Sequence, residues 1–107
     1  MIHNMPVPAR ILFFLMNSGK DLEVRVAFRR FESIQENDIL VFSSNCIRRV
    51  KKIRRYDSFA LMLQTESADR IGPGYAAPDI LSELRRIYPA NQERLGVIVF
   101  ELVTEEK

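Results

Sequence analysis

Three charged side chains lie close together near the start of one predicted strand: Lys20, Glu23 and Arg25. Side chains two residues apart in a β-strand share a face, so we expect Glu23 and Arg25 on one side, with Cα atoms ~6.5 Å apart. Lys20 stands at the turn just before them. The residues of the opposite face are all aliphatic, namely Leu22, Val24 and Val26. Two cations and one carboxylate at one end of a strand suit the binding of a polar, anionic ligand in a cleft.

Lys20 and Glu23 also allow a catalytic interpretation as an acid–base pair. General acid–base catalysis needs such groups within hydrogen-bonding reach of the reacting atoms. The alternative is structural, since Glu23 could hold Lys20 or Arg25 in a partly buried ion pair that shapes the cleft. The sequence leaves both interpretations open.

A second concentration of charge is the run Arg-Arg-Val-Lys-Lys-Ile-Arg-Arg at residues 48–55. Its basic residues, predicted to contact nucleic acid, are Arg48, Arg49, Lys51, Lys52, Arg54 and Arg55. Neighbouring like charges repel unless solvent, salt or an anion screens them, and a phosphate backbone supplies such anions. Strict alternation would place Val50 and Ile53 on opposite faces. We therefore expect either a β-bulge between them or an edge strand, where lysines block aggregation. Arg29 and Arg30 could extend this basic patch.

Aromatic side chains that could stack on a base are Tyr56, Tyr75 and Tyr88. Of these, Tyr56 and Tyr88 are predicted to join the ligand site, although a tyrosine in such a position also fits the core or the rim of a domain. The only histidine is His3 and the only cysteine is Cys46. A zinc site needs a cluster of such ligands, so neither a metal nor a cofactor is predicted.

The chain has 107 residues, of which 47% are hydrophobic and 28% charged, and its net charge is +2. These values predict one globular domain over residues 1–107. A single cysteine excludes an internal disulfide and favours a reducing compartment. The apolar run at residues 11–16 is far shorter than the ~20 residues that span a bilayer. We therefore expect a cytoplasmic protein with no membrane partner, and the sequence leaves its oligomeric state open.

The elements that must position these residues follow from hydrophobic periodicity. The expected strands cover residues 1–5, 22–28, 39–43, 47–55 and 96–103, and the expected helices cover residues 9–17, 59–65 and 78–88. Residues 29–38 are expected to form a loop or turn with Phe31 and Ile34 as apolar anchors, and residues 71–75 a loop. The first helix is expected to be mostly buried and to end at Gly19, and the last strand to be central or to close a barrel. A parallel doubly wound sheet would need regular strand–helix alternation. The order therefore favours an α+β fold, a small β-barrel with helices packed on it.

Several segments resemble the motifs of ASCH domains, a PUA-like group of small barrel proteins. The segments are Gly19-Lys20 with Glu23-x-Arg25, Phe31-x-x-Ile34-x-x-x-Asp38-Ile39, Val50-x-x-Ile53-x-x-Tyr56, Ile87-Tyr88-Pro89 and Gly96-Val97-Ile98. Asn37 stands where the family usually has glycine. The resemblance extends over nearly the whole chain. It implies a PUA-like β-barrel of five or six strands with flanking helices, a cleft beside the Lys-Glu-Arg strand, and RNA or a nucleotide as the partner.

The resemblance also implies an enzymatic alternative. Some related proteins look like ribonucleases, and one branch consists of amidohydrolases that deacetylate acetylated cytidine. The amidohydrolase pattern is a lysine, a threonine three residues later and a distant glutamate. Lys20 matches the lysine, but Glu23 takes the threonine position and Glu66, the nearest upstream glutamate, is no clear counterpart. A hydroxyl nucleophile is therefore missing. We expect an RNA- or nucleotide-binding module, with a hydrolase that uses Lys20 and Glu23 on RNA or modified nucleosides as the alternative.

Overall fold

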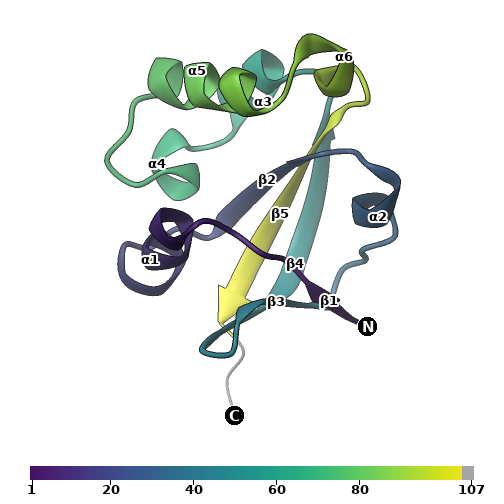
Figure 1. Ribbon diagram of the computed structural model, residues 1–107, viewed down its shortest axis with the longest axis vertical. Coiled ribbons are helices and arrows are strands. Elements are labelled where there is room, and N and C mark those ends of the chain that lie inside the picture. Colours follow the sequence, from purple (N-terminus) through teal and green to yellow (C-terminus); the bar gives the residue numbers. More distant parts are fainter. Residues whose placement is uncertain (105–107) are drawn as a thin grey trace.

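The computed structural model describes residues 1–104, which form one five-stranded sheet and six helices. The strands are β1 (Ile2–Asn4), β2 (Leu22–Val26), β3 (Ile39–Ser43), β4 (Cys46–Tyr56) and β5 (Val97–Thr104). They curl into a half-barrel in the order β1-β3-β4-β5-β2 (Figure 1). Strand β1 runs parallel to β3, and the other neighbours are antiparallel. This architecture confirms the predicted α+β fold, a small barrel-like sheet with flanking helices.

The helices are α1 (Ala9–Asn17), α2 (Arg29–Glu32), α3 (Phe59–Thr65), α4 (Ala68–Ile71), α5 (Ala77–Ile87) and α6 (Ala90–Glu93). Figure 1 shows α3, α5 and α6 gathered over one end of the sheet, with α1 and α4 on one flank and α2 on the other. Helix α4 contacts β2, and α1 contacts β4. Within residues 1–104, the helices are too short or too polar to cross a membrane.

Strand β5 is apolar on both faces because it lies inside the sheet, between β4 and β2. Residues 97–100 are fully buried. One face packs into a first core with α1 and α2, which includes Leu15 and Phe31. The other face packs into a second core with α3, α4 and α5, which includes Phe59 and Ile80. The prediction of a central last strand is confirmed.

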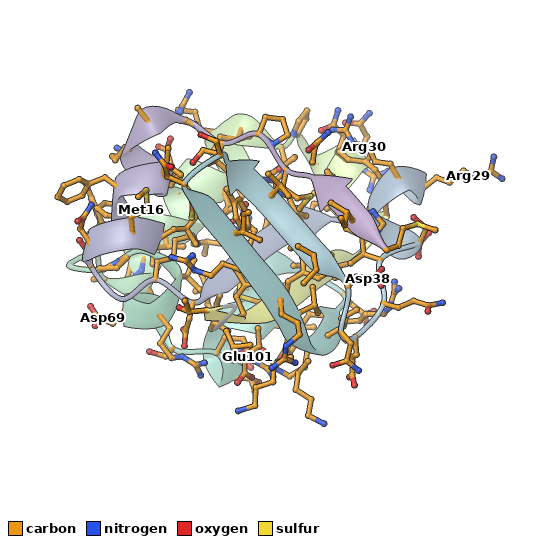
Figure 2. All side chains as sticks on the ribbon, turned by 90° about the horizontal axis from the view of Figure 1, so that it is seen from below. Met16, Arg29, Arg30, Asp38, Asp69 and Glu101 are labelled. Atoms are coloured by element: carbon orange, nitrogen blue, oxygen red, sulfur yellow. The ribbon has the colours of Figure 1, made fainter. Side chains whose placement is uncertain are left out.

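Helix α1 is less buried than its composition predicted. Leu15 is its one buried residue, whereas Phe13 is 57% exposed and Met16, labelled in Figure 2, is 45% exposed. The reason is that the sheet covers one side of the helix and no further layer covers the other. Gly19 ends the helix with a φ of +79°, a backbone conformation that favours glycine, and so it caps the helix as predicted.

Residues 29–38, expected as a loop or turn, begin with the helical turn α2. Phe31 and Ile34 are buried in the first core, and this anchoring stabilises a turn that local propensity does not predict. The short helices α4 and α6 were not predicted either. Asn37 adopts a φ of +75°, a conformation that asparagine tolerates better than most residues.

Strand β4 pairs with β5 along most of its length but with β3 only over residues 46–49, so residues 51–56 have a paired strand on one side only. Its register against β5 shifts between Val50 and Lys52, which is the predicted β-bulge. The bulge lets Val50 and Ile53 both pack against the first core. The edge-strand alternative therefore holds for the second half of β4, beside the bulge.

Candidate functional site

Lys20 is held in a buried position by the turn that follows α1. Its ammonium group donates to the Leu22 carbonyl and to the Ile71 carbonyl at 2.7 Å, and lies 3.2 Å from Glu23 Oε1. An ammonium has three N–H groups, so these acceptors satisfy all of them. With 3% of the side chain exposed, Lys20 acts as a fixed positive charge beneath Glu23.

Glu23 and Arg25 share a face of β2, as their spacing predicted. Arg25 Nε and Nη2 donate to Glu23 Oε2 at 2.9 and 2.7 Å. The Arg25 side chain is 11% exposed and the Glu23 side chain 7% exposed. Arg25 Nη2 also donates to the Pro6 carbonyl at 3.4 Å, and Arg25 Cζ lies 5.2 Å from the centroid of the Phe31 ring. Within residues 1–104, Nη1 donates to no group. Arg25 therefore keeps two N–H donors that no described residue accepts.

A cleft of about 870 Å³ opens beside these three side chains, between α1, β2 and α5, and all three line it. Its walls carry the aromatic rings of Phe14, Tyr75 and Tyr88 and the aliphatic side chains of Val7, Ile11, Ile80, Leu84 and Ile87. Its rim carries Arg10, Asp79, Glu83 and Arg86. Mostly apolar walls with a few convergent polar groups are typical of sites for small molecules.

Tyr88, predicted at the ligand site, lines this cleft at the end of α5. Its ring centroid lies 5.8 Å from that of Phe59 and 6.4 Å from that of Phe28. Burial raises the pKa of the Tyr88 phenol, so the hydroxyl keeps its proton at neutral pH. Tyr88 therefore offers the cleft both a ring face and a hydrogen-bond donor.

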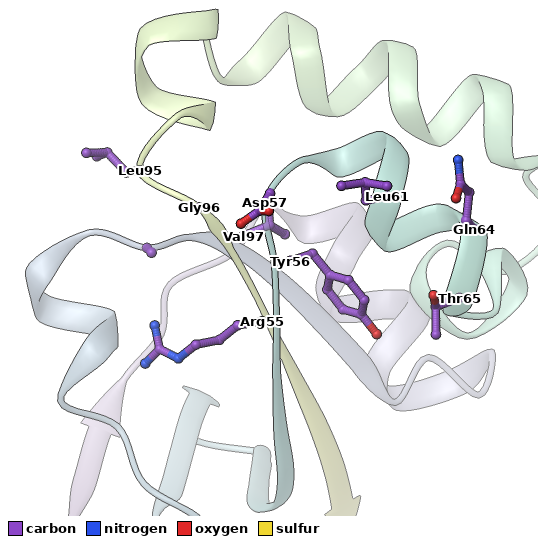
Figure 3. A pocket seen from close by; sticks show the side chains of 10 residues that line it. Arg55, Tyr56, Asp57, Leu61, Gln64, Thr65, Leu95, Gly96 and Val97 are labelled. Carbon is purple, nitrogen blue, oxygen red and sulfur yellow. The ribbon is translucent and has the colours of Figure 1, made fainter.

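Tyr56, the other tyrosine predicted at the ligand site, lies elsewhere. It lines a separate hollow of about 490 Å³ at the end of β4, where its side chain and that of Arg55 point to opposite sides of the strand (Figure 3). The Tyr56 hydroxyl donates to Glu66 Oε2 at 2.6 Å, and burial together with this hydrogen bond raises the pKa of Tyr56. Neither Tyr56 nor Glu66 lines the cleft beside Lys20.

Arg54, the most strongly paired of the β4 cations, is held by two carboxylates. Its guanidinium donates to the two oxygens of Glu66 at 2.6 and 2.9 Å and to Glu101 Oε1 at 2.7 Å. These bonds raise the pKa of Arg54 and lower the pKa of both carboxyl groups. Figure 2 labels Glu101, one of the two carboxylate partners of Arg54. The charge of Arg54 is thus largely neutralised within the protein.

The other β4 cations also have partners, apart from Lys52, which is exposed and forms no ion pair within residues 1–104. The partners are the Leu15 carbonyl for Arg48 (3.0 Å), Asn37 Oδ1 for Arg49 (3.1 Å), Glu101 for Lys51 (3.8 Å) and Glu32 for Arg55 (2.9 Å). Nucleic-acid binding by this strand stays a prediction, now for a run in which Lys51, Arg54 and Arg55 face carboxylates.

Sequence reasoning missed Arg70, which supports the site from below. Its guanidinium donates to both carboxylate oxygens of Asp21, at 2.7 and 2.9 Å, and this pairing raises the pKa of Arg70. The pair fastens α4 to the start of β2, which places the Ile71 carbonyl within reach of Lys20. No local signal could have revealed it, because Arg70 and Asp21 are 49 residues apart.

A second group of polar side chains ties β1 to the segment before β3. His3 Nε2 lies 2.8 Å from Asp38 Oδ2, which also accepts from the Gln35 N–H at 3.0 Å. The hydrogen bond to His3, and next that from Gln35, lower the pKa of Asp38 to about 2. Among the side chains placed by the structure, no three His, Cys, Asp or Glu residues come together as metal ligands.

Comparison with known proteins establishes the fold. No family model and no curated protein matches the sequence. The chain is similar to the crystal structure of hypothetical protein PH0355, with a TM-score of 0.88 and 26% identity over 95% of this chain and 97% of that one. It is also similar to the solution NMR structure of protein PF0455 from Pyrococcus furiosus, with a TM-score of 0.83 and 27% identity over the full length of both chains. Neither name states a ligand or an activity.

Proposed function

We propose that this protein is a nucleotide-binding module of the ASCH type, which holds a base in the cleft beside β2. The observation that carries the proposal is that the Glu23–Arg25 pair lies at the polar end of a cleft with aromatic walls. An unpaired base presents flat π faces and an edge of neighbouring donors and acceptors. Glu23 supplies an acceptor and Arg25 Nη1 supplies donors for such an edge. RNA as the source of the base follows from the ASCH resemblance.

On a rim that also carries the carboxylates Asp79 and Glu83, Arg10 supports a ligand with an anionic group. Arg10 lies there with its Cζ 5.9 Å from the centroid of Tyr75 and forms no ion pair within residues 1–104. Arg86 is on the same rim, paired with Glu83. An unpaired guanidinium near an apolar wall suits a phosphate attached to a stacked base.

Two observations favour binding over hydrolysis. The three N–H groups of Lys20 are all engaged by protein acceptors, so Lys20 has no donor left for a reacting group. The described residues that line the cleft include no serine, threonine or cysteine, and an acyl-transfer nucleophile of the amidohydrolase kind needs such a hydroxyl or thiol. Lys20 and Glu23 thus form a fixed ion pair at the base of the cleft. The hydrolase remains the alternative function.

NMR titration of the ¹⁵N-labelled protein with the four ribonucleoside 5′-monophosphates tests the proposal. At least one should shift amide signals of β2 and α5. Arg25→Ala should weaken that binding about 10- to 100-fold, since hydrogen bonds to charged groups contribute ~1.5–3 kcal/mol. Arg55→Ala is the matched control, because Arg55 is exposed, forms its ion pair among the described residues with Glu32, and lies outside the cleft.

Two results would overturn the proposal: shifts that lie away from β2 and α5, or equal affinity of the Arg25→Ala variant and the native protein. The hydrolase alternative predicts a different outcome. Incubation with acetylated cytidine or with RNA would then give products, and Lys20→Met would abolish their formation.

A further inference from the structure

We infer that the cleft takes one unpaired nucleotide of a longer single strand, whose phosphate backbone leaves the cleft across α2, where Arg29 and Arg30 hold it. The inference rests on the proposed function and extends it in two ways. It names a polynucleotide, rather than a free nucleotide, as the ligand. It also moves the phosphate-binding surface from β4, where the sequence predicted it, to α2.

The first argument is that the inner cation of the cleft and the cations of α2 are neighbours. Phe31 is buried, and both Arg25 and Arg30 stack on its ring, with Cζ–centroid distances of 5.2 and 4.7 Å. Arg25 lines the cleft, whereas Arg30 is exposed on α2. A single buried ring therefore links the polar end of the cleft to the outer surface of α2.

The second argument is that two aromatic rings, Phe28 and Tyr88, lie between the cleft and α2. The Phe28 and Tyr88 rings lie 6.4 Å apart and are both half-buried, and Tyr88 belongs to the cleft while Phe28 precedes α2. Arg30 Cζ lies 6.0 Å from the Phe28 centroid. The charge of Arg30 also acts on the Tyr88 phenol. Partly exposed aromatic rings beside a guanidinium form a surface on which a second base can stack.

The third argument is the balance of charge on the two basic surfaces. Arg29 and Arg30 are exposed and form no ion pair within residues 1–104, and Figure 2 shows Arg29 extending away from the body of the protein. On β4, by contrast, Lys51, Arg54 and Arg55 face carboxylates, and Lys52 is the exposed cation that forms no ion pair within residues 1–104. A cation that already has a carboxylate partner releases fewer counterions when it meets a phosphate, so unpaired cations contribute most to salt-dependent binding.

Fluorescence anisotropy with labelled single-stranded RNA decamers of each homopolymer, at several salt concentrations, tests the inference. The decamer that contains the preferred base should bind more tightly than its mononucleotide. Arg29→Ala/Arg30→Ala should flatten the log–log salt dependence by about 1.4, because each phosphate contact on a single strand contributes a slope of roughly 0.7. Arg29→Lys/Arg30→Lys keeps both charges and should keep the slope, and circular dichroism of the alanine variant checks that it remains folded.

The matched rival variant is Lys51→Ala/Lys52→Ala, which also removes two exposed cations, but from β4. A slope that flattens as much in this variant as in the α2 variant overturns the inference and restores the β4 surface. A decamer that binds no more tightly than its mononucleotide overturns the inference while leaving the cleft as a nucleotide site. Failure of every mononucleotide and every decamer to bind overturns the proposed function itself, and the inference with it.

Discussion

Replacing Glu23 by glutamine should destabilise the fold much more than the loss of a surface ion pair does. The substitution keeps the shape of the side chain but removes the negative charge between Lys20 and Arg25, whose side chains are 3% and 11% exposed. When one partner of a buried ion pair is removed, the other charge stays buried without compensation, at a cost of about 3–5 kcal/mol. A free energy of unfolding of ~5–15 kcal/mol is usual for a small domain, so this loss is a large part of the total.

Glu32→Gln provides the matched control, because it is the same chemical change in an ion pair of similar length. Glu32 lies 2.9 Å from Arg55, but the two side chains are 51% and 52% exposed. Exposed pairs contribute only about 0–1 kcal/mol, since water and salt screen them. The difference between the two variants thus isolates the effect of burial.

Urea denaturation followed by circular dichroism measures both variants. With a slope of ~2 kcal/mol per molar, which is ordinary for a small domain, the midpoint for Glu23→Gln should fall by roughly 1.5–2.5 M, and that for Glu32→Gln by less than about 0.5 M. Lys20→Met added to Glu23→Gln should cost less than the sum of the two single changes, because it removes one of the uncompensated charges. Equal midpoints for the Glu23 and Glu32 variants would refute the claim that Lys20, Glu23 and Arg25 form a buried charge cluster.

Three further outcomes are expected. Gly19→Ala should lower the free energy of unfolding by about 1 kcal/mol in thermal or urea melts, because the φ of +79° strains any residue with a Cβ atom. Tyr56→Phe should cost about 1.5 kcal/mol by losing the hydrogen bond to Glu66, and unchanged nucleotide affinity in NMR titration would confirm that Tyr56 lies outside the site. The pKa of Asp38 is about 2 in the folded protein against 3.8 ordinarily, so its stabilising effect is present above about pH 4 and is lost as the pH falls toward 2. Urea midpoints measured at pH 6 and pH 3 should therefore differ less in Asp38→Asn than in the native protein, and an equal difference would contradict this role.

The sequence predicted the fold and most of its elements because the strands and helices are locally consistent. Alternation placed Glu23 and Arg25 on one face of β2, and the apolar run before Glu101 placed β5 inside the sheet. The helical turn α2 escaped prediction because its stability comes from Phe31 in the core rather than from propensity. The exposure of Phe13 was not predicted either, because the composition of a helix does not show how many of its sides other elements cover.

The site was only half visible in the sequence. Lys20, Glu23 and Arg25 were found because they are neighbours along the chain, whereas the walls of their cleft come from α1 and α5, far away in sequence. Tyr56 was misplaced because the strand that carries it ends in a different hollow. The charge run of β4 was conspicuous, but its partners, such as Glu66, are set by tertiary contacts that no local pattern reveals.

The chain between β1 and α1 gives the cleft its location. Pro6 and Pro8 have no backbone N–H, so this stretch cannot continue a ladder of amide hydrogen bonds toward β2, whose outer edge faces it. The side chain of Arg25 connects the two segments instead, by donating to the Pro6 carbonyl. A sheet that closed here would leave no opening beside β2, and the gap in the barrel is thus what forms the cleft.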